Sequence, residues 1–185
     1  MRACPLVMRR WTAAWVLAAV VVATAVLSAN PLRITPVVAD DKVMATFAAP
    51  SVFTAEVREA VQSGMAVTLT FTAELRRTST LWFDQTLASA AVASSVKFDT
   101  LTSTYQVSKL RAGAVHWSQQ TQKEDEMRLW MTEFERITLD DLEVLSTTGE
   151  YYIRVRARDN LPRGFSLWPF GRPEVSGRAE LPAAR

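Results

Sequence analysis

Two aspartates, Asp84 and Asp99, are the residues of this sequence most suited to catalysis. They flank a segment that the pattern of side chains predicts to be a strand. Paired carboxylates can serve as acid and base in the hydrolysis of a glycan. An aspartate at a hairpin end or in a turn, however, usually accepts hydrogen bonds from nearby backbone groups. The sequence favours this structural role and keeps a cell-envelope hydrolase that uses Asp84 or Asp99 as an alternative.

Other catalytic and metal-binding patterns are missing from the sequence. His116 is the only histidine, whereas a zinc site uses several His, Cys or carboxylate ligands at set spacings. A Ser-His-Asp triad would need His116 as its base, and the G-x-S-x-G pattern of many serine hydrolases does not occur. The acidic clusters at 124–126 and 140–141 lack the glycine and the alternating acids of a calcium loop. We therefore expect no enzyme activity, no metal and no cofactor.

A third group of residues is basic. Arg154, Arg156 and Arg158 share one face of a predicted strand, because side chains on a strand alternate with a period of two. Arg76 lies on the polar face of another predicted strand. If these two faces meet, the arginines form a basic stripe that binds anionic lipid headgroups or an acidic partner. The alternative is an ordinary solvated face, or a sheet edge protected by charge.

The first forty residues indicate where such a surface would act. Three arginines precede an uncharged, mostly apolar run from Trp11 to Ala29, and the first acidic residue is Asp40. Basic residues before one apolar segment are typical of a signal peptide or of a transmembrane anchor helix. We expect residues 1–29 to be a cleaved signal or a retained membrane anchor, and both alternatives stay open. In either case the rest of the chain is expected to be exported to the periplasm.

Removing this leader changes the charge balance of the chain. The whole sequence has 21 Lys and Arg residues against 19 Asp and Glu, and four of the basic residues precede Asp40. The exported part is therefore slightly acidic, which gives no support to nucleic-acid binding. The only cysteine, Cys4, lies in the leader. The exported domain thus has no internal disulfide and must be stabilised by packing.

Alternating apolar residues predict an antiparallel β domain over residues 41–163. The clearest strand begins at Val67, where apolar residues alternate with Thr, Glu and Arg up to Arg76. It is predicted to form a long hairpin with a strand over 81–92. Residues 151–158 form a second clean strand. Several strands of this kind with few helices are typical of a β-sandwich.

Two short helices are expected beside these strands. Apolar residues recur at helical spacing over 53–61, with Thr54 as the N-cap and Gly64 at the C-terminal stop. The sequence from Thr121 to Glu124 fits a capping box, which predicts a second helix after it. Both helices are short compared with the strands, so the fold class is mainly β.

Proline-containing segments flank the predicted domain. Residues 30–40 contain Pro31 and Pro36, and we expect them to form a linker. Residues 164–185 contain three more prolines, and we expect them to form an irregular C-terminal tail.

The hairpin region resembles a known family in several short patterns. Residues 60–67 are similar to the family's ALxxGxPV pattern. Arg76-Arg77 with Trp82 and Asp84 are similar to its RR…W…D pattern, and residues 98–107 to its YDxLTxxYxV pattern. Over residues 43–162 the chain thus resembles an uncharacterised proteobacterial envelope family, the domain-of-unknown-function family 4390. It departs from the family pattern at Phe98, where the family has Tyr, and in the tail after Pro162.

The resemblance implies an exported, immunoglobulin-like β-sandwich with no established activity. The family-pattern residues in this chain are Trp82, Asp84, Asp99 and Tyr105. Members are often encoded beside a membrane sensor kinase, which implies an envelope protein, such as that kinase, as the partner. We therefore expect a periplasmic or membrane-proximal binding or adaptor module. The hydrolase and a purely structural envelope protein are the alternatives.

Overall fold

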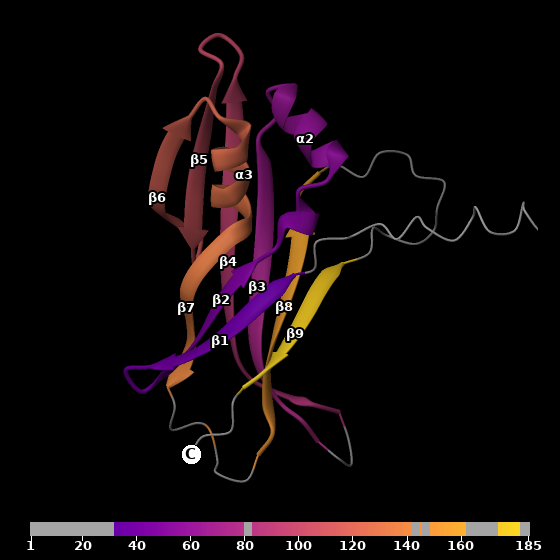
Figure 1. Cartoon of the computed structure of the whole chain (residues 1–185), viewed down its shortest axis with the longest axis vertical. Helices are drawn as coiled ribbons and strands as arrows, with labels where there is room; N and C mark the ends of the chain where they lie inside the picture. Colours follow the sequence, from indigo (N-terminus) through magenta and orange to yellow (C-terminus); the bar gives the residue numbers. More distant parts are fainter. Residues whose placement is uncertain (1–31, 80–82, 142–144, 146–148, 162–173, 182–185) are drawn as a thin grey trace, which may run out of the picture.

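The computed structural model describes residues 32–79, 83–141, 145, 149–161 and 174–181. Within these residues nine strands form two antiparallel sheets, accompanied by two α-helices and one short 3-10 helix (Figure 1). The predicted mainly β class with few helices is confirmed. No helix in the described ranges is long and apolar enough to cross a membrane. The expected leader, residues 1–29, lies outside the described residues.

The larger sheet has six strands in the order β6-β5-β4-β3-β8-β9. Its strands are β3 (Val67–Arg77), β4 (Gln85–Asp99), β5 (Thr104–Arg111), β6 (Ala114–Thr121), β8 (Tyr151–Asp159) and β9 (Val175–Glu180). The predicted long hairpin is confirmed, because β3 pairs antiparallel with β4 along its whole length, but β4 covers 85–99 instead of the predicted 81–92. The second predicted strand, now β8, pairs with the other edge of β3. Thus β3 is a central strand of the sheet.

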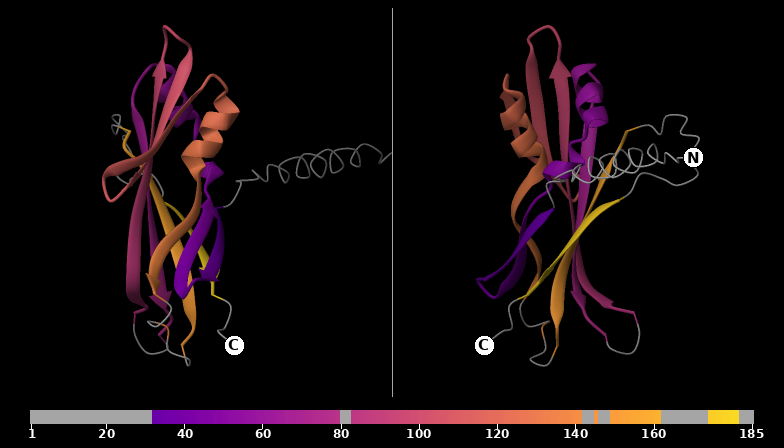
Figure 2. Two further views of the ribbon diagram at one scale, coloured as in Figure 1. Left: turned by 90° about the vertical axis from the view of Figure 1, so that its left-hand side faces the viewer. Right: turned by 45° about the vertical axis from the view of Figure 1, so that its right-hand side comes forward.

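A smaller layer covers one face of this sheet. It contains the sheet β1-β2-β7, formed by β1 (Arg33–Ala39), β2 (Lys42–Ala48) and β7 (Glu133–Asp141). The helices α2 (Ala55–Gln62) and α3 (Glu124–Thr132) and the 3-10 helix η1 (Pro50–Val52) lie on the same side (Figure 2). None of the described elements covers the opposite face, which we call the open face.

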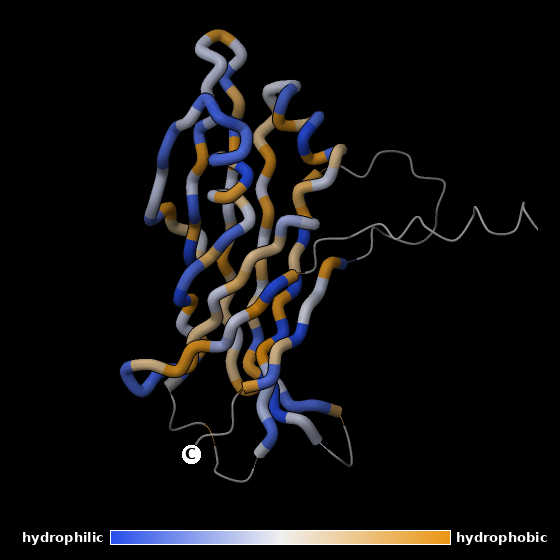
Figure 3. The backbone as a smooth tube through the Cα atoms, viewed as in Figure 1, coloured by the Kyte–Doolittle hydropathy of each residue, from blue (hydrophilic) through white to orange (hydrophobic). Residues whose placement is uncertain are grey.

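The core lies between the two layers. The rings of Phe47, Phe71 and Phe134, from β2, β3 and β7, pack with centroids 5.0 to 5.4 Å apart. Leu69, Phe71 and Leu75 have no exposed surface, whereas Thr70 is exposed. The period-two pattern of β3 therefore places its apolar residues in the core and its threonines on the open face. Strand β8 shows the same alternation from Ile153 to Arg158 (Figure 3).

The linker expected at residues 30–40 is wrong for 33–39, which form strand β1. Asp40 and Asp41 both have positive φ, 54° and 55°, which gives the tight two-residue turn from β1 into β2. Pro36 is tolerated because β1 is an edge strand. One side of an edge strand has no neighbouring strand, so a proline there removes no hydrogen bond between strands.

The irregular tail expected at residues 164–185 is wrong for 175–180, which form strand β9. The inward-facing residues of β9 include Gly177 and Ala179, whose small side chains give little hydrophobic pattern. A Cβ at Gly177 would lie 2.6 Å from Leu32 Cδ2, so glycine allows the chain before β1 to pack closely on β9. The remaining tail residues lie outside the described ranges.

The two helices are confirmed, and so are both predicted end signals of α2, whereas the capping box predicted for the second helix is not. Thr54 Oγ1 accepts a hydrogen bond from the Val57 N–H at 3.4 Å, and Gly64 follows α2 with φ of +84°. Helix α3 instead has Lys123 as its N-cap, without a side-chain cap. The Thr121 hydroxyl donates a hydrogen bond to Glu126 Oε2 at 2.7 Å. Thr121 thus contacts Glu126, two residues beyond the Glu124 of the predicted capping box.

Candidate functional site

The pairing of β3 with β8 brings the predicted basic residues together on the open face. Directly opposite residues in an antiparallel pair carry neighbouring side chains. The register sets Thr70 opposite Arg158, Thr72 opposite Arg156, Glu74 opposite Arg154, and Arg76 opposite Tyr152. We call this set the arginine face: Arg76, Arg154, Arg156 and Arg158, with the β3 side chains between them.

The centre of the arginine face is an acidic residue, Glu74, which the sequence analysis did not single out. Its side chain is only 8% exposed. Arg154 donates to Glu74 Oε2 from Nε at 3.1 Å and from Nη2 at 2.7 Å. Arg156 donates to Oε1, and Arg76 Nη1 lies 3.5 Å from Oε2. One buried carboxylate therefore holds three of the four arginines in place.

The charge state of Glu74 follows from two opposing effects. Burial raises the pKa of its carboxyl group, because desolvation disfavours the charged form. The hydrogen bonds and positive charges of Arg154 and Arg156 outweigh burial and hold the pKa of Glu74 below its ordinary value. Glu74 is thus ionised at neutral pH, and the centre of the arginine face is an ion-pair cluster.

The Arg158 end of the face is more open to water. The side chain of Arg158 is 73% exposed, and its Nε lies 3.1 Å from Oε1 of Glu174, just before β9. Arg156 Nε lies 4.0 Å from the same carboxylate oxygen. This Nε atom of Arg156 is buried and has no hydrogen-bond partner among the described residues. A hollow of about 180 Å³ lies here, lined by Thr70, Thr72, Arg156, Arg158 and Glu174.

Asp84 lies at the opposite end of the arginine face, just before β4. Its carboxylate accepts a hydrogen bond from the Tyr152 hydroxyl at 2.6 Å and one from the Ser79 N–H at 3.2 Å. Arg76 Nη2 donates to the Asp84 carbonyl oxygen at 2.7 Å. The guanidinium of Arg178 lies 3.8 Å from the centroid of the Tyr152 ring. These contacts, first of all the Tyr152 hydroxyl, lower the pKa of Asp84.

Comparison with known proteins agrees with the sequence patterns quoted above. The model of a family described as a domain of unknown function, DUF4390, matches residues 29–175. The chain belongs to this family. The match includes both aspartates and the whole arginine face. No curated protein and no solved structure is found to be similar to the chain.

The DUF4390 pattern residues have different positions in this fold. Asp84 accepts a hydrogen bond from the Ser79 N–H between β3 and β4. Trp82 lies outside the described residues. Tyr105, on β5, is buried, and its ring lies 4.6 Å from that of Phe98 on β4. Asp99 Oδ1 accepts from the N–H groups of Leu101 at 2.9 Å and Thr102 at 3.3 Å. These contacts give the pattern residues structural roles in turns and packing.

The two aspartates of this DUF4390 member do not come together. They lie at the two ends of β4, which at about 3.3 Å per residue separates them by on the order of 50 Å. Glycosidase carboxyl pairs are about 5 to 10 Å apart. The backbone N–H groups also lower the pKa of Asp99, whereas a general acid needs a raised pKa. Asp84 and Asp99 therefore do not form the carboxylate pair of a glycosidase.

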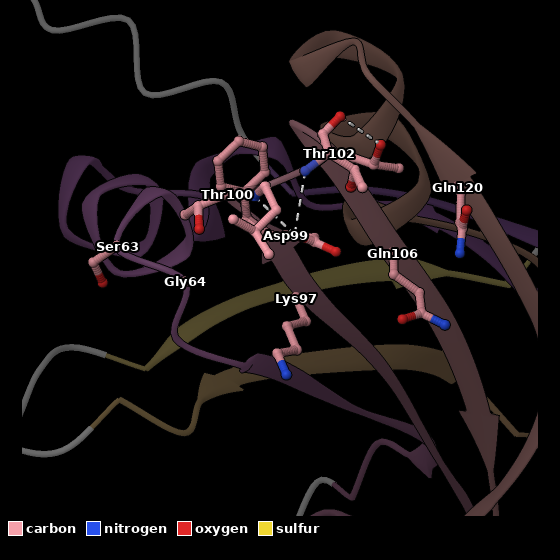
Figure 4. A pocket seen from close by; sticks show the side chains of 11 residues that line it. Ser63, Gly64, Lys97, Asp99, Thr100, Thr102, Gln106 and Gln120 are labelled. Carbon is pink, nitrogen blue, oxygen red and sulfur yellow. Dashed lines mark hydrogen bonds between the residues drawn. The ribbon is translucent and has the colours of Figure 1, made fainter.

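A second hollow of about 570 Å³ lies beside Asp99 at the β4–β5 turn. Figure 4 shows Ser63, Lys97, Asp99, Gln106 and Gln120 around it, with the Asp99 carboxylate directed back to its own turn. Lys97 is the only charged side chain that lines this hollow apart from Asp99. The single histidine, His116, is exposed on β6 and does not line it. The charged side chains lining this hollow are Lys97 and an Asp99 carboxylate that its own turn engages, so the arginine face is the better candidate site.

Sequence reasoning missed the acidic half of the arginine face. Glu74 and Glu174 neutralise half of the charge that the four arginines would otherwise present. One signal was available in the pattern: Glu74 is the only acidic residue on the threonine-rich face of β3. Glu174 offered none, because its position depends on the pairing of β9 with β8.

Proposed function

We propose that this chain is an exported binding or adaptor module of the cell envelope, and that its arginine face binds an acidic partner. The observation that carries the proposal is the row of arginines on a face that no described element covers. Arginine forks bind carboxylates and phosphates through paired, charge-assisted hydrogen bonds. Arg158 is mostly exposed at the end of this row and can exchange its internal partner for an external one.

The leader supports the export part of the proposal. Its basic start and its apolar run from Trp11 to Ala29 favour a signal peptide or a membrane anchor. The domain is then periplasmic, either soluble after cleavage or held at the membrane by its N-terminal segment. The immunoglobulin-like form of the sandwich belongs to the same proposal and is supported by the two packed antiparallel sheets. A membrane sensor kinase is the protein partner that the family resemblance suggests.

Two exposed arginines of the same sheet allow a matched test of binding. The variants are Arg158→Gln and, as the control, Arg111→Gln at the end of β5, both in the full chain. After crosslinking in intact cells and capture through a C-terminal tag, we expect less partner with Arg158→Gln than with the parent or the control. Recovery without crosslinking should fall as salt rises, because the screening length drops from about 8 Å at 0.15 M to about 3 Å at 1 M.

Two outcomes would contradict the proposal separately. Equal recovery of the partner from Arg158→Gln and Arg111→Gln, at every salt concentration, would remove the binding role and favour a structural envelope protein. An alkaline phosphatase fusion after Arg185 should be active, since the enzyme works only outside the cytoplasm. An inactive phosphatase together with an active cytoplasmic reporter at the same junction would overturn export.

A further inference from the structure

The hollow at the Arg158 end of the arginine face is lined mainly by groups that can donate hydrogen bonds. Thr70 and Thr72 provide two hydroxyl groups, and Arg156 and Arg158 provide two guanidinium groups. These side chains come from directly opposite positions on β3 and β8. Their relative placement is therefore fixed by the sheet and does not depend on a loop.

One of these donors is unsatisfied. Arg156 Nη2 is engaged by Glu74, but Arg156 Nε is buried and has no hydrogen-bond partner among the described residues. A buried N–H without an acceptor is unfavourable, and an oxygen atom placed beside it is stabilised. The hollow is thus lined by an arginine that the ion pair with Glu74 already orients and whose buried Nε still lacks an acceptor.

Glu174 is the acidic group that now borders the hollow. Its Oε1 lies 3.1 Å from Arg158 Nε but 4.0 Å from Arg156 Nε, which is too far for a hydrogen bond. Its side chain is 33% exposed. Glu174 Oε1 is therefore within hydrogen-bond distance of the Arg158 guanidinium but not of Arg156 Nε. Water can compete for the contact with Arg158.

We propose that this hollow is a subsite for a phosphate-type oxyanion and that Glu174 is a displaceable internal occupant. The proposal rests on the proposed function, since it names the acidic group that the arginine face binds. Two guanidinium groups and two hydroxyls offer more donors than the two oxygens of a carboxylate can use. A phosphate group presents its oxygens in several directions and matches the fork geometry of arginine.

The position of the hollow relates it to the predicted membrane anchor. Ser176 of β9 is paired with Arg156, and the next residue, Gly177, lies against the side chain of Leu32. Leu32 follows the apolar run, which ends at Ala29, by three residues. Three residues span at most about 10 Å. A retained anchor would thus keep this sheet edge near the headgroup phosphates of the membrane, and a soluble phosphate is the other source.

The test titrates the full chain in neutral detergent micelles with three probes. These are inorganic phosphate, phosphatidylglycerol added to the micelles, and a short glutamate peptide at matched ionic strength. The readout is the NMR signal of the Arg156 Nε–H group, identified by its loss in Arg156→Lys. We expect a saturable shift with phosphate or phosphatidylglycerol, because the unpaired N–H gains an acceptor.

Three variants sharpen the titration. Glu174→Gln removes both the competing contact and the repulsion between the Glu174 charge and a bound anion, and it should tighten binding about tenfold, or about 1.4 kcal/mol. Arg158→Gln should weaken binding by a similar factor. Thr72→Val keeps the shape of the side chain but removes a hydroxyl, and it should weaken binding several-fold without changing the unfolding midpoint. A merely structural Glu174 would give no gain of affinity in the first variant.

Each outcome decides the proposal. Saturation with both phosphate probes, or with phosphatidylglycerol alone, supports the phosphate subsite and identifies the lipid headgroup as a source of the ligand. Saturation with inorganic phosphate alone supports the subsite and identifies a soluble phosphate as the ligand. Saturation with the glutamate peptide alone overturns it in favour of a carboxylate ligand. No shift with any probe, or unchanged affinity in Glu174→Gln, overturns it as well. In that case the proposed function still stands if Arg158→Gln loses the crosslinked partner.

Discussion

The centre of the arginine face and its Arg158 end contain the same kind of ion pair in different surroundings. The Glu74 side chain is 8% exposed and is held by arginines that are themselves only about a third exposed. The Glu174 side chain is 33% exposed, and its partner Arg158 is 73% exposed. The comparison shows that burial, rather than residue type, separates a pair that belongs to the fold from a pair that can exchange partners.

The physical reason is the cost of removing charge from water. A buried carboxylate is stable only while its cationic partners remain, so removal of one partner leaves an uncompensated charge. An exposed pair loses little, because water replaces either partner at almost the same free energy. The Glu74 centre is therefore expected to contribute to stability, and the Glu174 end to binding.

The largest effect is expected for Glu74→Gln. The variant leaves Arg154 and Arg156 without their counter-charge in a partly dehydrated site, and it should lower the free energy of unfolding by about 3 kcal/mol. The matched control is Glu174→Gln, which should change it by less than about 0.5 kcal/mol. Urea unfolding followed by circular dichroism measures both. Equal losses in the two variants would contradict the distinction between the centre and the Glu174 end.

The dependence of stability on pH is the next test of the Glu74 centre. Because the folded-state pKa of Glu74 is below its ordinary value of 4.5, its contribution is complete above that pH and is lost as the pH falls through the folded-state pKa. The difference in unfolding free energy between the parent and Glu74→Gln should be constant from pH 7 to about 5 and should shrink towards pH 3. Asp84 and Asp99 also have lowered pKa values, but both proteins contain them, so they cancel in the difference.

The faces of the individual strands could be predicted from the sequence. The period of two in β3 and β8 places Phe71 in the core and three arginines of β8 on one face, and the structure agrees. The register between the two strands could not be predicted in the same way. It joins segments about 80 residues apart, and no pattern within either strand specifies that Glu74 lies opposite Arg154.

The edge strands were the part of the fold that sequence patterns missed. Strand β1 contains Pro36, and β9 faces inward with Gly177 and Ala179, so neither has the continuous apolar alternation of a central strand. Their formation depends on neighbours that are already in place, namely β2 and β8. The acidic residue Glu174 enters the candidate site only through β9, which explains why the site looked purely basic in the sequence.

A smaller effect is expected at the Asp84 end of the face. Burial and the hydrogen bond to Asp84 raise the pKa of the Tyr152 phenol. Asp84→Asn removes the negative charge and should lower the pKa of Tyr152 towards its ordinary value of 10. The change can be followed by NMR of the phenol ring carbon, with Tyr152→Phe to identify the signal among the three tyrosines. An unchanged pKa would mean that the Tyr152–Asp84 contact does not persist in solution.

The smallest effect should be the coupling between Arg158 and Glu174. A double-mutant cycle with Arg158→Gln and Glu174→Gln isolates the free energy of the pair itself, because effects on other residues cancel. We expect a coupling of less than about 0.5 kcal/mol, since both side chains are solvated and screened. The same cycle on Arg154 and Glu74 should give a coupling several times larger, because water does not replace the lost contact there.

The two cycles together decide whether the Glu174 contact can be exchanged. A weak coupling means that an external anion displaces Glu174 from Arg158 at little cost to the fold, as binding at this end requires. A coupling at Arg158 as large as that at Arg154 would show that the Glu174 contact is part of the fold. The arginine face would then be a continuous structural cluster with no end available to a partner.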